Sequence, residues 1–223
     1  MSSLLTEPYE AQSARWPAAG RHILAQYDDE TVVVYQAYRA SIGRFAAEAG
    51  YFGDGFSLDR MSWIKPNFLW MMYRSGWATR AGQEVVLAVW LAREAFDQIL
   101  GAAVPSSFDE RRYPDRATWQ AAVKSSDVRL QWDPDHAPGG QPLARRAVQL
   151  GLRGKTLASY ARPWIRRIED ITPYVRAQRE QLSAGSAGLL STPVERVYPC
   201  AEPAATMLGI DPPGAFRGLQ SSP

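Results

Sequence analysis

The chain has 223 residues, of which 46% are hydrophobic, enough for one sizeable core. A net charge of +2 does not require a nucleic-acid partner, and one cysteine, Cys200, excludes an internal disulfide. With only two histidines, a Cys/His zinc site is not expected. No apolar run approaches the roughly 18 residues of a membrane span. We therefore expect a soluble, cytoplasmic, single-domain protein that binds no metal.

The N-terminal part of the chain predicts a strand followed by a helix. Residues 19–26 suit one short helix, and a valine-rich run at residues 31–39 predicts the first strand. Apolar positions then recur at helical spacing over residues 41–50. Ser41 is a suitable N-cap and Gly50 a suitable C-cap for this helix.

Residues 61–77, MSWIKPNFLWMMYRSGW, combine three tryptophans with only two basic residues, which is not typical of a solvated surface. They predict a strand over residues 61–65 and a buried helix with Pro66 in its first turn. We interpret residues 31–39 and 61–77 as the two segments that line one cleft.

The remaining pattern predicts alternating strands and helices and then a tail. The expected elements are strands at 84–91, 128–132, 143–152 and 165–172, helices at 93–100, 115–124 and 175–182, a surface loop at 105–113 and a turn at 133–142. The predicted domain spans residues 1–183, with its core at about 28–178. Residues 184–223 are rich in Ser, Gly and Pro and predict an extended, partly mobile tail, in which residues 194–198 can dock.

Two basic residues of these segments are candidates for binding an anion. Arg39 lies at a strand end, where a guanidinium can clamp a phosphate, although an ion pair with Glu48 or Asp59 is the structural alternative. Lys65 follows a buried strand, so its ammonium must reach water or an anion. The neighbouring aromatic residues, Trp63, Trp70, Tyr73 and Trp77, suit either stacking on a ring or core packing.

Two further groups of residues support other functions. Asp133, Asp135 and His136 resemble an acid/base cluster for a hydrolase, but their Pro/Gly-rich surroundings favour a turn. A basic cluster could bind RNA or DNA, through Arg145, Arg146, Arg153 and Lys155. The chain lacks GxSxG, P-loop, GxGxxG and HExxH motifs, which argues against the enzyme classes that they define.

Several runs together resemble the bacterial and fungal family catalogued as domain of unknown function 4291. They are VVVYQAYRASIGRFAAEAGYF, FSLDRMSWIKPNFLWMMYRSGW, RLQWDPDH, RRAVQLGLRG and WIRRIEDITPYV. The resemblance covers about residues 25–180 and implies no reaction by itself.

The order of elements is also similar to the ADP-ribosyltransferase fold. This resemblance implies an α+β protein with a split antiparallel β-sheet, flanking helices and NAD in a central cleft. It implies that the site residues are Gln36, Tyr38 and Arg39 from the first strand, Ser62, Trp63 and Lys65 from the second, Tyr73 from the helix, and Gln149 from a late strand.

In the enzyme hypothesis that follows, NAD is the substrate and the acceptor of ADP-ribose is a nucleic acid or a small molecule. Arg39 clamps a phosphate, Ser62 and Lys65 orient the ribose and diphosphate, Tyr73 stacks on nicotinamide and Gln149 positions the ribose. The fold usually carries a glutamate where this chain has Gln149, and an amide cannot act as a general base. A non-enzymatic nucleotide- or RNA-binding protein is therefore the alternative.

Overall fold

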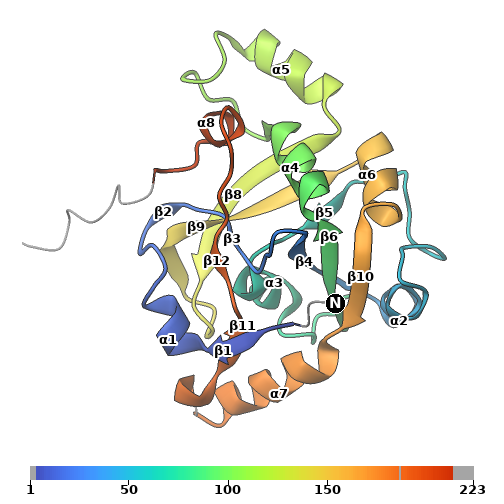
Figure 1. Cartoon of the computed structure of the whole chain (residues 1–223), viewed down its shortest axis with the longest axis vertical. Coiled ribbons are helices and arrows are strands. Elements are labelled where there is room, and N and C mark those ends of the chain that lie inside the picture. The colour runs from blue at the N-terminus through green and yellow to red at the C-terminus, as the bar shows by residue number, and fades with distance from the viewer. Residues whose placement is uncertain (1–3, 186, 213–223) are drawn as a thin grey trace, which may run out of the picture.

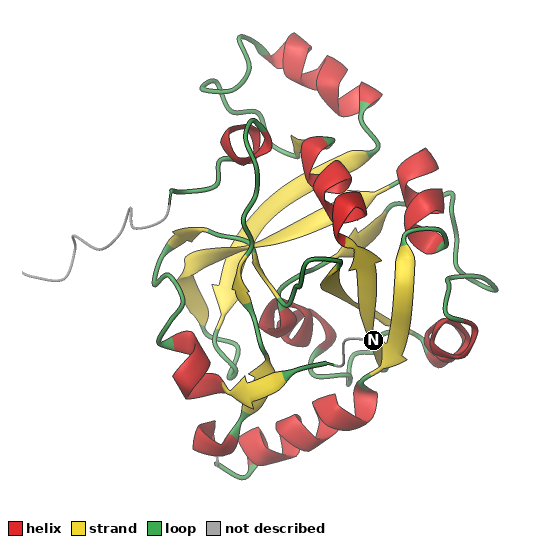
Figure 2. Cartoon of the chain, viewed as in Figure 1, coloured by secondary structure: helices red, strands yellow, loops and turns green. Residues whose placement is uncertain are grey.

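Two larger sheets and two small two-stranded sheets, with helices around them, make up the computed structural model, which describes residues 4–185 and 187–212 (Figures 1 and 2). The strands are β1 (Thr6–Pro8), β2 (Gly20–Arg21), β3 (Leu24–Ala25), β4 (Thr31–Tyr38), β5 (Ser62–Ile64), β6 (Val85–Ala92), β7 (Ala103–Pro105), β8 (Val128–His136), β9 (Pro142–Leu152), β10 (Ile165–Asp170), β11 (Ser191–Pro193) and β12 (Arg196–Val197). The α-helices are α1 (Tyr9–Ser13), α2 (Ala40–Ala49), α3 (Phe68–Ser75), α4 (Arg93–Gly101), α5 (Arg116–Ser125), α6 (Gly154–Ala161), α7 (Thr172–Ser183) and α8 (Ala204–Leu208), and η1 (Ala187–Leu189) is a 3-10 helix.

The first sheet is antiparallel, with the strand order β10-β6-β4. Strands β4 and β6 read as nearly continuous apolar runs because helices cover both faces of the sheet, whereas β10 is charged and only partly buried. Val32 and Val34 on β4 belong to one core cluster, with residues of α2, α4 and α6. Val33 and Tyr35 belong to the opposite cluster, which contains residues of α3 and α7.

The second sheet is mixed and is built around the β8–β9 hairpin. Strand β5 pairs antiparallel with the C-terminal half of β9, whereas β2 and β7 pair parallel with β9 and β8. The chain is therefore an α+β protein with several antiparallel pairings and flanking helices, as the sequence predicted at this level.

The two sheets meet at one pair of residues, Tyr35 on β4 and Lys65 just after β5. The backbone N–H of Tyr35 donates to the Lys65 carbonyl at 2.7 Å, and the Lys65 N–H donates back at 3.3 Å. Strand β4 stays paired with β6 through Tyr38, whereas the pairing of β5 with β9 ends at Ile64. Next to this joint, Gln36 of β4 contacts Ser62 of β5.

The structure confirms most predicted elements of the middle of the chain. The strand and helix at residues 31–50 are β4 and α2, and Gly50 ends α2 with a left-handed φ of 77°, as a C-cap glycine does. The predicted strands at 61–65, 84–91, 128–132, 143–152 and 165–172 and helices at 93–100, 115–124 and 175–182 all have counterparts.

Several local predictions were wrong. The helix predicted at residues 19–26 is replaced by the short strands β2 and β3, which pair with distant segments. The N-cap of α2 is Arg39, not Ser41, and no side chain caps it. Helix α3 begins at Phe68, because the side chain of Asn67 accepts the Trp70 N–H at 2.7 Å.

The hairpin and the helix after it also differ from the prediction. Strand β8 continues to His136, so the turn expected at 133–142 is confined to residues 137–141. Pairing with β9 overrides the Pro/Gly composition there. Helix α6 was not predicted, although Asp127 accepts hydrogen bonds from the Lys155 and Thr156 N–H groups at its start.

The described part of the C-terminal segment pairs with the N-terminal part of the chain (Figure 1). Strand β11 pairs antiparallel with β1, and β12 pairs with β3. Between them, Glu195 is buried and its carboxylate accepts hydrogen bonds from the Phe68 N–H at 2.5 Å and the Asn67 amide at 3.1 Å. This segment therefore completes the N-terminus of α3.

None of the helices in the described ranges has the length and apolar character of a membrane span.

Candidate functional site

A cleft of about 460 Å³ opens beside the joint between the two sheets, a volume in the range of small-molecule sites. Its walls come from the end of β4, the start of α2, the loop before β5, β5 itself, α3 and one residue of β9. The predicted site residues in its wall are Gln36, Tyr38, Arg39, Ser62, Trp63, Lys65 and Gln149. The structure thus brings together residues that are more than a hundred positions apart in the chain.

Gln36 holds the two walls of the cleft together. It is only 3% exposed, and its Nε2 donates to Ser62 Oγ at 3.0 Å and to the Trp63 carbonyl at 3.1 Å. The Gln36 side-chain oxygen Oε1 accepts from the Tyr160 hydroxyl at 2.5 Å. Tyr38 and Ser62 hydroxyls are 2.9 Å apart, and burial raises the pKa of the Tyr38 phenol. Gln36 therefore positions Ser62, while the hydroxyl groups face the ligand space.

Four cationic side chains line the cleft, and no carboxylate does among its described lining residues. The four are Arg39, Arg60, Lys65 and Arg74, and none of them forms an ion pair with a described residue. The structural alternative for Arg39, an ion pair with Glu48 or Asp59, is not formed. Such a set of unpaired cations attracts and orients a negatively charged ligand.

Lys65 is the deepest of the four, with 5% of its surface exposed. Burial lowers the pKa of its ammonium group to about 8, and the nearby Arg74 adds to this effect, while Asp133 opposes it. A buried ammonium without a hydrogen-bonding partner costs stability, so an anion in the cleft would stabilise the charged form of Lys65.

Gln149 contributes from β9, opposite Gln131 on β8. Its Nε2 donates to Gln131 Oε1 at 2.9 Å and to Asp133 Oδ2 at 2.7 Å. These two contacts fix the amide orientation and leave its oxygen as an acceptor. Burial raises the pKa of Asp133, against the opposing effects of Gln149 and Lys65.

Tyr73 does not line the cleft. Its ring stacks on His136 with centroids 3.6 Å apart and on Trp70 at 5.5 Å, and the side chain is about half exposed. The aromatic residues that line the cleft are Tyr38, Phe56 and Trp63. The indole of Trp63 lies against Gly151 on β9, where an added Cβ would be 3.0 Å from two indole atoms.

Asp133, Asp135 and His136 make separate contacts and do not form the acid/base cluster that their spacing resembles. Asp135 pairs with Arg145 in a buried ion pair of 2.6 Å, and His136 lies in the aromatic stack. Only Asp133 approaches the cleft residues. Among residues 4–185 and 187–212, no group of three His, Cys, Asp or Glu side chains could hold a metal ion.

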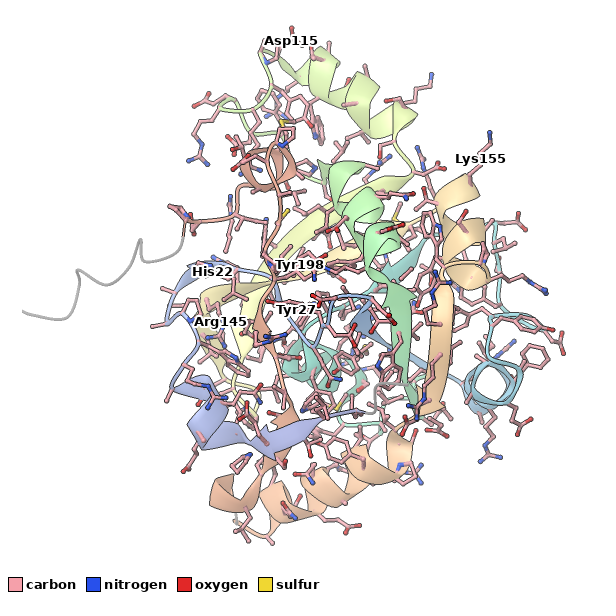
Figure 3. All side chains as sticks on the ribbon, in the orientation of Figure 1. His22, Tyr27, Asp115, Arg145, Lys155 and Tyr198 are labelled. Atoms are coloured by element: carbon pink, nitrogen blue, oxygen red, sulfur yellow. The ribbon has the colours of Figure 1, made fainter. Side chains whose placement is uncertain are left out.

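The proposed nucleic-acid cluster is divided between different parts of the molecule. Arg145 is buried by Asp135 and Trp16, whereas Arg153 binds the Val123, Lys124 and Ser126 carbonyls. Figure 3 shows Arg145 and Lys155 on opposite sides of the view. Arg146 and Lys155 remain exposed but lie on different elements, β9 and α6. These four residues do not form one continuous basic surface.

Sequence reasoning missed three contributors to the site. Arg60 lies in the loop before β5, and Arg74 was interpreted only as the end of a helix. Tyr160 lies on the unpredicted helix α6 and reaches Gln36 from there. The available signal was Arg74 in the last turn of an otherwise apolar helix, because a charge on such a helix has to reach an opening or solvent.

The protein is an α+β protein whose two larger sheets are joined at Tyr35 and Lys65. A cleft of small-molecule size lies beside this joint, and its basic lining favours anions. The family model described as Domain of unknown function (DUF4291) matches residues 22–198. The chain belongs to this family, which confirms the resemblance seen in the sequence. A comparison with curated proteins finds no match.

Proposed function

We propose that the protein binds NAD in this cleft and transfers its ADP-ribose group to an acceptor, as an enzyme with an ADP-ribosyltransferase-like fold. The observation that supports this most strongly is the cleft lining: four cations without an ion pair, three hydroxyl groups and an indole, with no carboxylate among the described lining residues. NAD combines a negatively charged diphosphate with ribose hydroxyls and flat aromatic rings, so each part has a matching partner.

The side chains suggest a role for each part of NAD. Arg39, Arg60 and Arg74 can bind the diphosphate, with Lys65 as a deeper cation. Ser62, held by Gln36 and Tyr38, can bind a ribose hydroxyl. We assign the ring-stacking role to Trp63 rather than Tyr73, because Tyr73 already stacks on His136 outside the cleft.

The proposed reaction exchanges one bond for another at the ribose carbon that carries nicotinamide. A nucleophile of the acceptor forms a bond to this carbon while the carbon–nitrogen bond breaks, and the bonding electrons leave with neutral nicotinamide. The nucleophile loses its proton. Gln149 can accept a hydrogen bond from the ribose and hold it in place, since its amide hydrogens are taken by Gln131 and Asp133.

A second candidate function is nucleotide binding without catalysis. The specific observation in its favour is Gln149, an amide at the position where this fold usually carries a glutamate. An amide retains the hydrogen bond to ribose but provides no negative charge for a developing oxocarbenium ion. This candidate predicts binding of NAD without release of nicotinamide.

A titration with NAD tests the proposal directly. Trp63 faces the cleft, so binding is expected to give a saturable change in tryptophan fluorescence. Released nicotinamide is then measured with RNA, DNA or cell protein as acceptor. Binding with release supports the transferase, and binding without release supports the second candidate. Absence of any saturable change contradicts both candidates.

A further inference from the structure

A second cavity, of about 790 Å³, lies along β8 on the side of the 105–116 segment. Three kinds of polar group line it: the arginines Arg21, Arg111, Arg112 and Arg116, the carboxylates Asp109, Glu110 and Asp133, and the hydroxyls Ser106 and Ser107. None of these residues belongs to the NAD cleft described above.

Two hydrogen bonds from Gln149 link the cleft to this second cavity. Gln149 lines the cleft and donates to Asp133, which lines the second cavity, at 2.7 Å. Gln131 also lines the second cavity and accepts from the same Gln149 amide nitrogen at 2.9 Å. The Gln149–Asp133 contact therefore lies between the two cavities.

Asp133 is the carboxylate at this meeting point. It is partly buried and forms no ion pair with a described residue. Asp109, by contrast, is paired with Arg111 at 3.0 Å and Arg112 at 3.7 Å, and Glu110 is exposed. Burial raises the pKa of Asp133, while Gln149, Lys65, Arg146 and His136 oppose this effect. A carboxylate of raised pKa is a better proton acceptor than an ordinary one.

The other end of the second cavity holds two neighbouring guanidinium groups. Arg21 and Arg112 both lie directly against Gly209, whose left-handed φ of 67° and missing side chain leave room for them. Burial lowers the pKa of Arg112, the charge of Asp109 opposes this effect, and the charges of Arg21 and Arg111 lower the pKa further. A bound anion would add to the compensation that Asp109 gives these like charges.

We infer that the second cavity holds the acceptor of the transfer reaction, an anionic molecule with a hydroxyl nucleophile, and that Asp133 takes the proton from that hydroxyl. This inference rests on the proposed function. It adds the class of the acceptor and the base that takes the acceptor's proton, neither of which the proposed function names. The hydroxyl oxygen bonds to the ribose carbon, nicotinamide leaves with the electrons of the broken carbon–nitrogen bond, and the hydroxyl proton passes to the Asp133 carboxylate and then to water.

Asp133→Asn tests the base without removing the hydrogen bond that Gln149 needs, because asparagine retains a side-chain oxygen. We expect NAD affinity within about twofold of wild type and nicotinamide release reduced about 100-fold or more, the range for loss of a general base. Asp133→Glu should recover part of the rate. Asp54→Asn, an exposed aspartate outside both cavities, is the matched control.

The pH profile separates a base from a merely structural role. Wild-type release should rise with pH as Asp133 ionises, and this limb should disappear in Asp133→Asn. If Asp133→Asn releases nicotinamide at the wild-type rate with the wild-type profile, the inference is wrong although the transferase proposal stands. If wild-type protein neither binds NAD nor releases nicotinamide, the transferase proposal itself fails.

Two probes with a phosphate and hydroxyl groups test the acceptor class: ribose 5-phosphate and a short 5′-phosphorylated RNA. At saturating NAD, at least one should raise nicotinamide release, and Arg112→Gln should remove the increase. Stimulation by ribose 5-phosphate identifies a small-molecule acceptor, and stimulation by the RNA alone identifies a nucleic-acid end. If neither probe stimulates release, or if Arg112→Gln responds as wild type does, the anionic acceptor site is contradicted.

Discussion

At the scale of single residues, Lys65 shows how the site departs from what stability alone would favour. The side chain is buried at the joint of the two sheets, has no described hydrogen-bonding partner and lies near another cation, Arg74. A protein under selection only for stability would place an apolar residue there. The position is explained if the charge is used to bind an anion.

Lys65→Met is expected to stabilise the protein at neutral pH while weakening NAD binding. The pKa of Lys65 falls from 10.5 in its ordinary state to about 8 in the folded protein. Below pH 8 the folded state therefore carries a penalty of about 3 kcal/mol, at about 1.4 kcal/mol per pH unit. The penalty disappears as the pH rises from 8 to 10.5, so the advantage of methionine should shrink over this window.

Denaturant unfolding of wild type and Lys65→Met at pH 7 and pH 10 measures this effect. Lys124→Met, at an exposed position on α5, is the control and should change the free energy of unfolding little at either pH. A Lys65→Met protein that is less stable than wild type at pH 7 would show that Lys65 is satisfied in the folded state, contrary to the account given above.

At the scale of elements, helix α3 depends on residues from three distant parts of the chain. Asn67 caps it, Glu195 accepts the Phe68 N–H and the Asn67 amide, and Gln12 donates to Thr192 and accepts from the Glu195 N–H. Burial raises the pKa of Glu195 well above its ordinary value. The C-terminal segment thus fixes the helix that supplies Arg74 to the cleft.

Glu195→Ala should destabilise the protein, because it leaves the Phe68 N–H and the Asn67 amide buried without an acceptor. Each such donor costs about 1–3 kcal/mol. Thermal or denaturant unfolding measures the loss, and Glu180→Ala, an exposed glutamate on α7, is the control. Equal stability of Glu195→Ala and wild type would mean that the C-terminal segment does not hold α3.

The elements that the sequence predicted are those with strong local patterns. The valine-rich run of β4 and the 3.6-residue spacing of α2 define their structure without distant partners. The short strands β2, β3, β11 and β12 carry no such pattern, because pairing with remote segments creates them. In the same way, the turn-forming Asp and Pro residues of 133–136 were overridden by pairing with β9.

At the scale of the whole molecule, the joint between the sheets decides which residues can act together. The sequence indicated that the ends of β4 and β5 line one cleft, since both carry polar residues after apolar runs. It could not show that Tyr73 points away, that Trp63 faces the cleft, or that Asp133 reaches Gln149. Those facts depend on register across β8, β9 and β5, which no local pattern encodes.

The central claim is that unpaired cations at this joint bind the diphosphate of NAD. Calorimetric titration of NAD into wild type, the double variant Arg39→Gln/Arg74→Gln, and the control Arg176→Gln on α7 tests it most directly. We predict saturable binding by wild type and Arg176→Gln, and affinity at least about 100-fold weaker in the double variant, since each charge-assisted hydrogen bond contributes about 1.5–3 kcal/mol. Equal affinity of all three proteins for NAD, or no binding by wild type, would contradict the claim.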